Sequence, residues 1–199
     1  DGMQNQYVLY RQKGLDGEPE LFLDPNTFSE DGTVALGDLQ FSKDAKIVAY
    51  SISKSGSDWN EIYVMDVETK TKKQDHLEWI KFSGVSWKDD GFYYSSYDKP
   101  ADGDVLKAKN EYHKVYYHKL GTLQSEDLLI HKSDEFPQRN YGAGTTEDES
   151  FLILSESEGT SGNSLWVKKL DGTDKPFTLI AEGFDFEYYI LENFGDQLM

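Results

Sequence analysis

Residues 115–118 are Val-Tyr-Tyr-His, and a turn at Gly121-Thr122 follows shortly after them. This combination of an apolar-aromatic segment and a polar turn occurs four times in the chain, about 50 to 55 residues apart. The four segments are Tyr7-Val8-Leu9-Tyr10, Ile62-Tyr63-Val64-Met65, Val115-Tyr116-Tyr117-His118 and Leu165-Trp166-Val167-Lys168. β-Branched and aromatic residues favour strands, whereas Gly, Asp and Thr favour the tight turns of hairpins. Each copy therefore predicts a β-hairpin.

A second recurring unit lies between these hairpins. In it, an Asp in a tight turn precedes an apolar strand, as Asp44 precedes Ile47-Val48-Ala49-Tyr50-Ser51. The corresponding strands of the other two copies are Phe92-Tyr93-Tyr94-Ser95 and Phe151-Leu152-Ile153-Leu154-Ser155. An Asp side chain in such a turn accepts hydrogen bonds from backbone N–H groups. The two units together predict four antiparallel strands in about 50 residues, which is the period of a propeller blade.

The repeat predicts an all-β chain that forms a partial β-propeller of four-stranded antiparallel blades. A β-sandwich also has many short strands, but it would not repeat the same four-strand pattern three times. We expect half a blade in 1–37, blades at about 38–83, 84–132 and 140–182, and the start of a further blade in 183–199, which opens in Phe184–Leu191. Because closed propellers have about four to eight blades, we expect both ends to be cuts in a longer chain. Open blade faces are then expected to favour self-association.

The composition excludes several classes of partner. The 199 residues carry a net charge of -17, so nucleic-acid binding, which needs a basic surface, is not expected. The acidic surface has two interpretations, namely solubility and attraction of cationic peptides. No apolar run approaches the roughly 18 to 20 residues of a membrane helix, and the first residues do not resemble a signal peptide, so no membrane partner is expected. The absence of Cys fits a reducing compartment and favours the cytoplasm, with the periplasm as the alternative.

Catalytic motifs are missing from the sequence. It has no Gly-x-Ser-x-Gly nucleophile elbow, and the nearest string, Gly159-Thr160-Ser161-Gly162, lies in a polar stretch between two predicted strands. Gly142-Ala143-Gly144 lacks the third Gly and the following helix of a dinucleotide site, so it predicts a turn. The four histidines, His76, His113, His118 and His131, are interpreted as surface or packing residues. His113 and His118 are five positions apart, so on a strand they face opposite sides and cannot share a metal ion. We expect no catalytic residue, no metal and no cofactor.

One loop allows two interpretations. Ser53–Trp59 joins the second and third strands of a predicted blade and places Asp58 and Trp59 side by side. Trp59 packs against the blade edge and Asp58 orders the turn in the first interpretation. In the second, the loop lines a pocket in which Asp58 meets a cationic group of a ligand.

A series of short signatures resembles the propeller of the prolyl oligopeptidase family of serine peptidases. The matching elements are Asp24–Leu36, Phe41-Ser42-Lys43-Asp44, Ala49-Tyr50, Ser55-Gly56-Ser57-Asp58-Trp59, Lys81-Phe82-Ser83 followed by Trp87, Tyr116-Tyr117-His118 and Leu120–Asp127. They occur in the order of the family from about residue 7 to residue 170. Their order makes the resemblance specific, since each signature alone is too short to identify a family.

The resemblance implies a seven-bladed propeller that covers an α/β-hydrolase domain with a Ser-Asp-His triad. The parent protein would be a serine-type prolyl endopeptidase that cleaves short peptides after proline. The propeller would be its non-catalytic filter, with short proline-containing peptides and the hydrolase domain of the same parent chain as partners. No residue here matches the triad, so we expect this fragment to be inactive alone. The competing hypothesis is a free-standing propeller that acts as an interaction scaffold without a catalytic domain.

Two positions carry over as expected contacts of the substrate. Phe82, in the Lys-Phe-Ser signature, would help to form the apolar S3 subsite, and packing inside a blade is its alternative role. Asp58 would lie at the same cavity and attract the free amino group of a substrate. The sequence departs from the family at Ala45, where relatives have Gly after the turn aspartate. We expect this change only to stiffen the turn.

Overall fold

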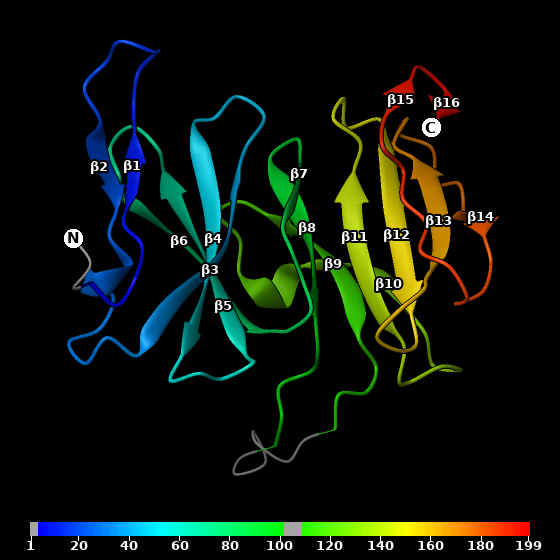
Figure 1. The fold of residues 1–199 in the computed structure, drawn as a ribbon. Helices are drawn as coiled ribbons and strands as arrows, with labels where there is room; N and C mark the ends of the chain where they lie inside the picture. The colour runs from blue at the N-terminus through cyan, green and yellow to red at the C-terminus, as the bar shows by residue number, and fades with distance from the viewer. Residues whose placement is uncertain (1–3, 102–108) are drawn as a thin grey trace. The chain divides into compact units, whose positions relative to one another are not determined.

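A computed structural model of the chain describes residues 4–101 and 109–199 (Figure 1). β-Strands make up nearly all of its regular secondary structure. Two short 3-10 helices are also present, and no α-helix occurs in the described ranges. The predicted all-β class is therefore confirmed. The chain divides into two compact units, Asp1–Glu78 and Trp79–Met199. No described segment forms a helix that is long and apolar enough to cross a membrane.

The first unit contains a hairpin and an antiparallel sheet. The hairpin pairs β1 (Leu9–Arg11) with β2 (Glu20–Leu23), and η1 (Pro25–Thr27) follows it. The strands of the sheet are β3 (Val34–Phe41), β4 (Ile47–Lys54), β5 (Asn60–Asp66) and β6 (Lys72–Ile80), whose last two residues belong to the second unit. They lie beside one another in chain order, and β4 pairs antiparallel with both β3 and β5.

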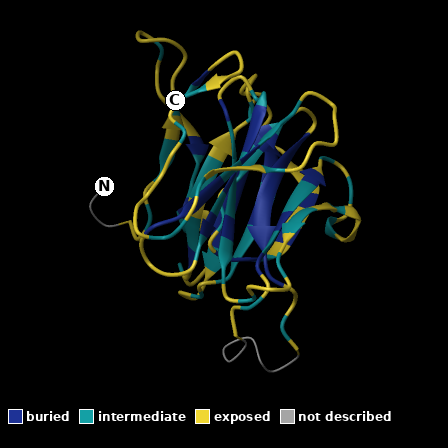
Figure 2. Ribbon diagram, turned by 90° about the vertical axis from the view of Figure 1, so that its right-hand side faces the viewer, coloured by how far each residue is buried: buried dark blue, intermediate teal, exposed yellow. Residues whose placement is uncertain are grey.

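Alternate residues of β4 form the core of this unit. Val48, Tyr50 and Ile52 point to one side of the sheet because successive strand residues face opposite sides. They pack with Phe22 of β2 and Met65 of β5, and all five are buried. Figure 2 shows buried residues along the strands and exposed residues mainly in the loops. The hairpin is thus attached to the sheet by apolar burial.

The second unit contains two antiparallel sheets and a small hairpin. One sheet has the order β7 (Ser86–Lys88), β8 (Gly91–Ser96), β9 (Lys114–Lys119) and β10 (Leu128–Lys132), with η2 (Gln124–Glu126) before β10. The other has the order β11 (Asn140–Thr145), β12 (Phe151–Ser157), β13 (Ser164–Lys169) and β14 (Thr178–Ala181). The hairpin pairs β15 (Asn193–Phe194) with β16 (Gln197–Leu198). Within the described residues none of these sheets closes on itself.

β8 is the most deeply buried strand of the second unit, since all six of its residues are buried. Phe92 packs at ring-centroid distances of 5.2 Å from Trp87 and 5.3 Å from His118. The strand begins with Gly91, where a Cβ atom would lie 2.1 Å from the backbone carbonyl oxygen of His118. Only glycine fits this close approach between neighbouring strands.

Most predicted strands are formed where the sequence indicated. The segments 47–51, 62–65, 92–95, 115–118, 151–155 and 165–168 lie inside β4, β5, β8, β9, β12 and β13. In the first copy only Leu9 and Tyr10 belong to a strand, and no strand forms in 184–191. The turn predicted at Gly142-Ala143-Gly144 is wrong, because these residues lie inside β11 and pair with β12. The blade limits stay a prediction. Residues 1–3 of the predicted half blade and residues 102–108 of the predicted blade 84–132 lie outside the described residues.

The turn aspartates act as predicted in two copies of the repeated turn-and-strand pattern. Asp44 accepts the backbone N–H of Lys46 at 3.1 Å, and Asp148 accepts that of Ser150 at 3.0 Å. The hydrogen bonds from Lys46 and Ser42 lower the pKa of Asp44 to about 2. The expectation for Ala45 is wrong, however, because its φ of 54° lies in the left-handed region, which a Cβ atom disfavours. Alanine strains this turn rather than only stiffening it.

Candidate functional site

Phe82 lies in the second unit, in the connection between β6 and β7. Its side chain is 59% exposed, although the preceding Lys81 is buried. The backbone φ of Phe82 is 52°, a left-handed conformation that costs a non-glycine residue about 1 to 2 kcal/mol. The Lys81 Nζ atom lies 5.3 Å from the centre of the Phe82 ring, within the range of a cation–π contact. The segment therefore presents an aromatic ring to solvent on a strained backbone.

The segment around Phe82 is held by hydrogen bonds from other parts of the second unit. His113 Nε2 lies 2.9 Å from the carbonyl oxygen of Lys81, and the backbone N–H of Tyr141 donates to His113 Nδ1 at 3.0 Å. On the other side, the backbone N–H of Ser95 donates to Ser83 Oγ at 2.7 Å. The residues on both sides of Phe82 are thus tied to the sheets, and this offsets the cost of its conformation.

Asp58 lies in the first unit, in the loop between β4 and β5. Ser55 and Gly56 have φ values of 52° and 68°, and the N–H of Ser57 donates to the carbonyl of Lys54 at 3.0 Å. Two positive φ values with this hydrogen bond define a type I′ turn, which suits the twist of a hairpin. Asp58 follows the turn as an exposed residue, and its backbone carbonyl accepts the side-chain N–H of Asn60 at 3.2 Å.

The two predicted substrate contacts belong to different units, Asp58 to the first and Phe82 to the second. Each is exposed in its own unit, so packing inside a blade, the alternative considered for Phe82, does not describe its ring. That both residues line one substrate cavity stays a prediction.

The histidines differ in environment more than the sequence indicated. His113 and His118 are completely buried and His131 packs edge-to-face on Tyr141, so these three are packing residues as predicted. His118 Nδ1 lies 2.7 Å from Asp127 Oδ1. The hydrogen bonds of His113 were missed by the sequence analysis, because strand alternation indicates a face but not a bonding partner on another strand. Burial lowers the pKa of His113 to about 4, and the ring is therefore neutral at physiological pH.

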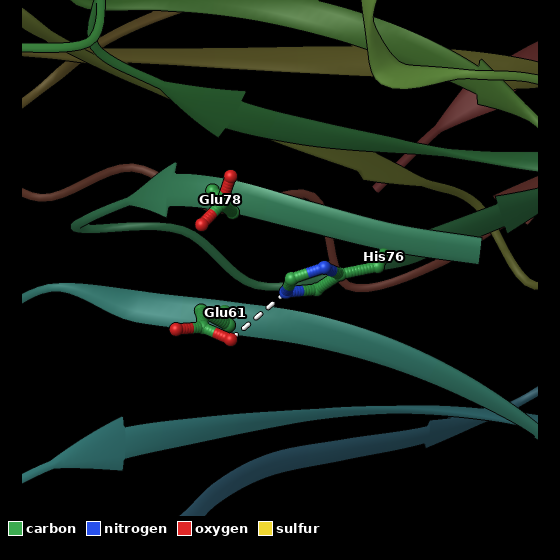
Figure 3. A group of neighbouring side chains, drawn as sticks. All are labelled: Glu61, His76 and Glu78. Atoms are coloured by element: carbon green, nitrogen blue, oxygen red, sulfur yellow. Dashed lines mark hydrogen bonds and ion pairs between the residues drawn. The ribbon is translucent and has the colours of Figure 1, made fainter. Parts of the chain in front are cut away.

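Among the described residues, Glu61, His76 and Glu78 form a group that could hold a metal ion, since their ligand atoms lie within 4.8 Å of one another. Figure 3 shows His76 and Glu78 on β6, with Glu61 on the neighbouring β5. His76 and Glu78 are two positions apart on one strand and share a face. The sequence alone did not indicate this group, because it does not show how β5 is aligned with β6 and therefore that Glu61 lies on this face.

Glu61 is already bound by other side chains of its unit. One carboxylate oxygen accepts from Lys54, and the other accepts from Tyr63 at 2.6 Å and lies 2.8 Å from His76 Nε2. Burial alone would raise the pKa of Glu61, but these hydrogen bonds outweigh burial and lower it to about 2. The His76 ring stacks on Tyr63 at 4.5 Å and 5°. A metal ion would have to displace these partners, so the group is better described as an ion-pair network. That the chain binds no metal stays a prediction.

An open hollow of about 440 Å³ lies in the second unit beside β8, β9 and β10. Tyr93, Tyr117 and Leu128 line it together with the turn that follows β13. Two of its lysines pair with carboxylates, Lys168 with Asp174 at 3.1 Å and Lys169 with Asp196 at 2.6 Å. Phe82 is not among the lining residues, so this hollow is separate from the segment that presents it.

Comparison with known proteins identifies the relatives of this chain. Residues 1–199 match the family model described as the prolyl oligopeptidase N-terminal beta-propeller domain. The prolyl endopeptidase of Elizabethkingia meningoseptica is 50% identical over 200 residues, which cover 100% of this chain and 28% of that protein. Prolyl oligopeptidase A of Amanita bisporigera is 34% identical over 230 residues, which cover 99% and 30%. The chain thus spans less than a third of the length of these relatives.

A solved structure gives the same result. Prolyl oligopeptidase B from Galerina marginata, bound to a 35mer hydrolysis and macrocyclization substrate, superposes with a TM-score of 0.87 at 30% identity. The match covers 98% of this chain and 30% of that one. These likenesses confirm the partial β-propeller predicted from the repeat and the resemblance to the prolyl oligopeptidase family.

Proposed function

The chain belongs to the prolyl oligopeptidase N-terminal β-propeller family, and on this premise we propose that it is the substrate-gating propeller of a serine-type prolyl endopeptidase. The observation that carries the proposal is the family match along the whole chain, together with relatives that are named prolyl endopeptidases. In the proposed role, the propeller limits which peptides reach a nucleophile that another domain supplies.

The proposed partners are that catalytic domain, an α/β-hydrolase of the same parent chain, and short proline-containing peptides. The net charge of -17 supports a preference for substrates with a free amino group, because an acidic surface raises the local concentration of cations. Folded proteins would be excluded by size rather than by chemistry. The chain itself supplies no triad residue to this mechanism.

Phe82 is the proposed apolar contact for the third substrate residue on the N-terminal side of the cleaved bond. Its exposed ring and its fixed backbone support this role, since a recognition group must be both accessible and held in place. Asp58 is the proposed contact for the substrate amino group, because it is an exposed carboxylate just after a well-ordered turn.

The test uses the full-length protein that contains this chain. Phe82→Ala should lower kcat/KM for peptides with a bulky third residue by about 5- to 100-fold, as expected for loss of an apolar pocket contact. Peptides with a small third residue should be little affected. Phe194→Ala is the control, because Phe194 is 64% exposed in the same unit but carries no proposed contact. Equal losses for bulky and small residues would show that Phe82 does not contact the substrate.

A second measurement separates the gating role from the scaffold hypothesis. The 199-residue chain alone should not hydrolyse a proline-containing chromogenic peptide, whereas the full-length protein should, with sensitivity to a serine-directed inhibitor. A full-length protein without a Gly-x-Ser-x-Gly motif and without this activity would instead support a free-standing interaction propeller.

A further inference from the structure

We infer that His113 is a positioning residue for Phe82. By its bond to the Lys81 carbonyl, His113 sets the direction of the exposed Phe82 ring. This inference rests on the proposed contact between Phe82 and the substrate. His113 lies just before β9, far from Phe82 in the sequence, and touches no proposed substrate group itself. Its effect on substrate selection would therefore be indirect.

The hydrogen bonds of His113 define a single protonation state. Tyr141 N–H can only donate, so His113 Nδ1 must be the acceptor of this bond. The proton of a neutral imidazole then lies on Nε2, which donates to the Lys81 carbonyl. The ring is fully buried and packs 4.4 Å from Tyr97, centroid to centroid, so both bonds are shielded from water. His113 thus joins the segment after β6 to β11 of the other sheet in the unit.

The Lys81 carbonyl controls Phe82 because both belong to one peptide unit. The carbonyl of Lys81 and the N–H of Phe82 lie in one plane, so a bond to the carbonyl oxygen fixes the orientation of that plane. With the plane fixed, the φ of Phe82 determines where its Cβ and ring point. This φ is 52°, which an unrestrained phenylalanine would leave for the β or right-handed region. Without the bond from His113, the plane before Phe82 would lose one restraint and the ring would shift its direction, although the bond between Ser95 and Ser83 would still hold the other side of the segment.

Two substitutions separate the bonds of His113. Glutamine is long enough for its amide N–H to take the place of Nε2–H and to donate to Lys81. Asparagine is shorter, and its carbonyl oxygen takes the place of Nδ1 and accepts from Tyr141, but its amide does not reach Lys81. A role limited to packing or to binding β11 predicts that Asn is tolerated at least as well as Gln. A positioning role predicts the opposite.

The primary measurement is the ratio of kcat/KM for a bulky and a small third residue in the full-length protein. His113→Asn should reduce this ratio at least 5-fold, towards the ratio of Phe82→Ala. His113→Gln should keep the ratio within about 2-fold of that of the unsubstituted protein. The kcat/KM for the small-residue peptide should stay within about 2-fold in both variants. A reduced ratio in His113→Gln but not in His113→Asn, or the same ratio in both variants, would overturn the inference.

A second readout does not depend on activity. In the labelled full-length protein, the NMR shifts of the Lys81 carbonyl carbon and the Phe82 amide should move less in His113→Gln than in His113→Asn. If Phe82→Ala leaves the selectivity unchanged but these shifts follow the pattern, the proposed substrate contact fails and the positioning of Phe82 stands. If Phe82→Ala changes the selectivity and the shifts are the same in Gln and Asn, the positioning role fails and the substrate contact stands.

Discussion

Replacing Asp127 by alanine removes the shared acceptor of two buried donors in the second unit. Asp127 Oδ1 lies 2.7 Å from His118 Nδ1, and Asp127 Oδ2 accepts from the Tyr94 hydroxyl at 2.7 Å. The side chains of His118 and Asp127 are each only 1% exposed. Burial and the charge of Asp127 raise the pKa of Tyr94, so its hydroxyl keeps its proton and donates. Water cannot replace the lost carboxylate without entering this core.

The expected cost follows from the two donors that lose their partner. A buried donor without an acceptor costs about 1 to 3 kcal/mol. Because two donors lose their acceptor, we expect Asp127→Ala to lower the free energy of unfolding by about 2 to 6 kcal/mol. Asp127→Asn keeps the shape of the side chain and one acceptor oxygen, but its NH₂ group lies against one of the two donors, His118 or Tyr94. Its expected cost is therefore about 1 to 3 kcal/mol.

Urea denaturation followed by tryptophan fluorescence and by circular dichroism measures these free energies. Asp134→Ala is the control, because Asp134 pairs with Lys132 at 2.9 Å while its side chain is 75% exposed. An exposed ion pair contributes only about 0 to 1 kcal/mol. If Asp127→Ala is no more destabilising than Asp134→Ala, the network of His118, Tyr94 and Asp127 does not stabilise the fold, and the reasoning from buried donors is refuted.

Three further predictions concern pH, backbone strain and association. The pKa of His113 is lowered by burial to about 4 from 6.5, so the unfolded chain binds this proton more readily, and stability falls as the pH drops from about 6.5 towards 4. Between pH 6.5 and pH 5, urea titrations should show a fall of about 1.5 kcal/mol in the free energy of unfolding that His113→Gln lacks. An equal fall in both proteins would contradict this prediction. Ala45→Gly should raise the free energy of unfolding by about 0.5 to 1 kcal/mol because it relieves a φ of 54°, whereas a lower melting temperature would contradict the strain. Self-association through exposed apolar residues such as Leu128 and Ile180 should increase with salt, which screens the net charge of -17, and a monomer at all concentrations and salts in sedimentation would contradict it.

The strands of the fold could be predicted from the sequence where a local pattern decides them. β8 and β12 are apolar-aromatic segments bounded by turns, and both formed as indicated. The segment 184–191 has a similar composition but forms no strand, because its backbone bonds elsewhere. The N–H of Asn163 donates to the carbonyl of Phe186 at 2.9 Å, and the Asn163 side chain accepts the N–H of Tyr188 at 2.7 Å. A side chain more than 20 residues away thus takes the place of a neighbouring strand.

The candidate site could be predicted only in part. Phe82 and Asp58 were found through short signatures, and their exposure in the structure agrees with a role at a surface. The turn at Ser55-Gly56 could also be predicted in kind, since glycine favours the positive φ of a type I′ turn. No local pattern indicated that Phe82 itself adopts a positive φ, because phenylalanine has no intrinsic preference for it.

The conformation of Phe82 depends on groups that the sequence does not place near it. His113 is 32 residues from Lys81, and Tyr141 is 28 residues from His113, so the bonds exist only after both sheets of the unit have formed. A left-handed phenylalanine would relax in an isolated peptide, since no local interaction offsets its cost of about 1 to 2 kcal/mol. Its exposed ring is therefore a product of tertiary structure, and substitutions that loosen the sheets should alter the direction of the ring before they unfold the unit. If Phe82 contacts the substrate as proposed, the determinants of substrate selection lie partly in buried residues such as His113, which do not touch the substrate themselves.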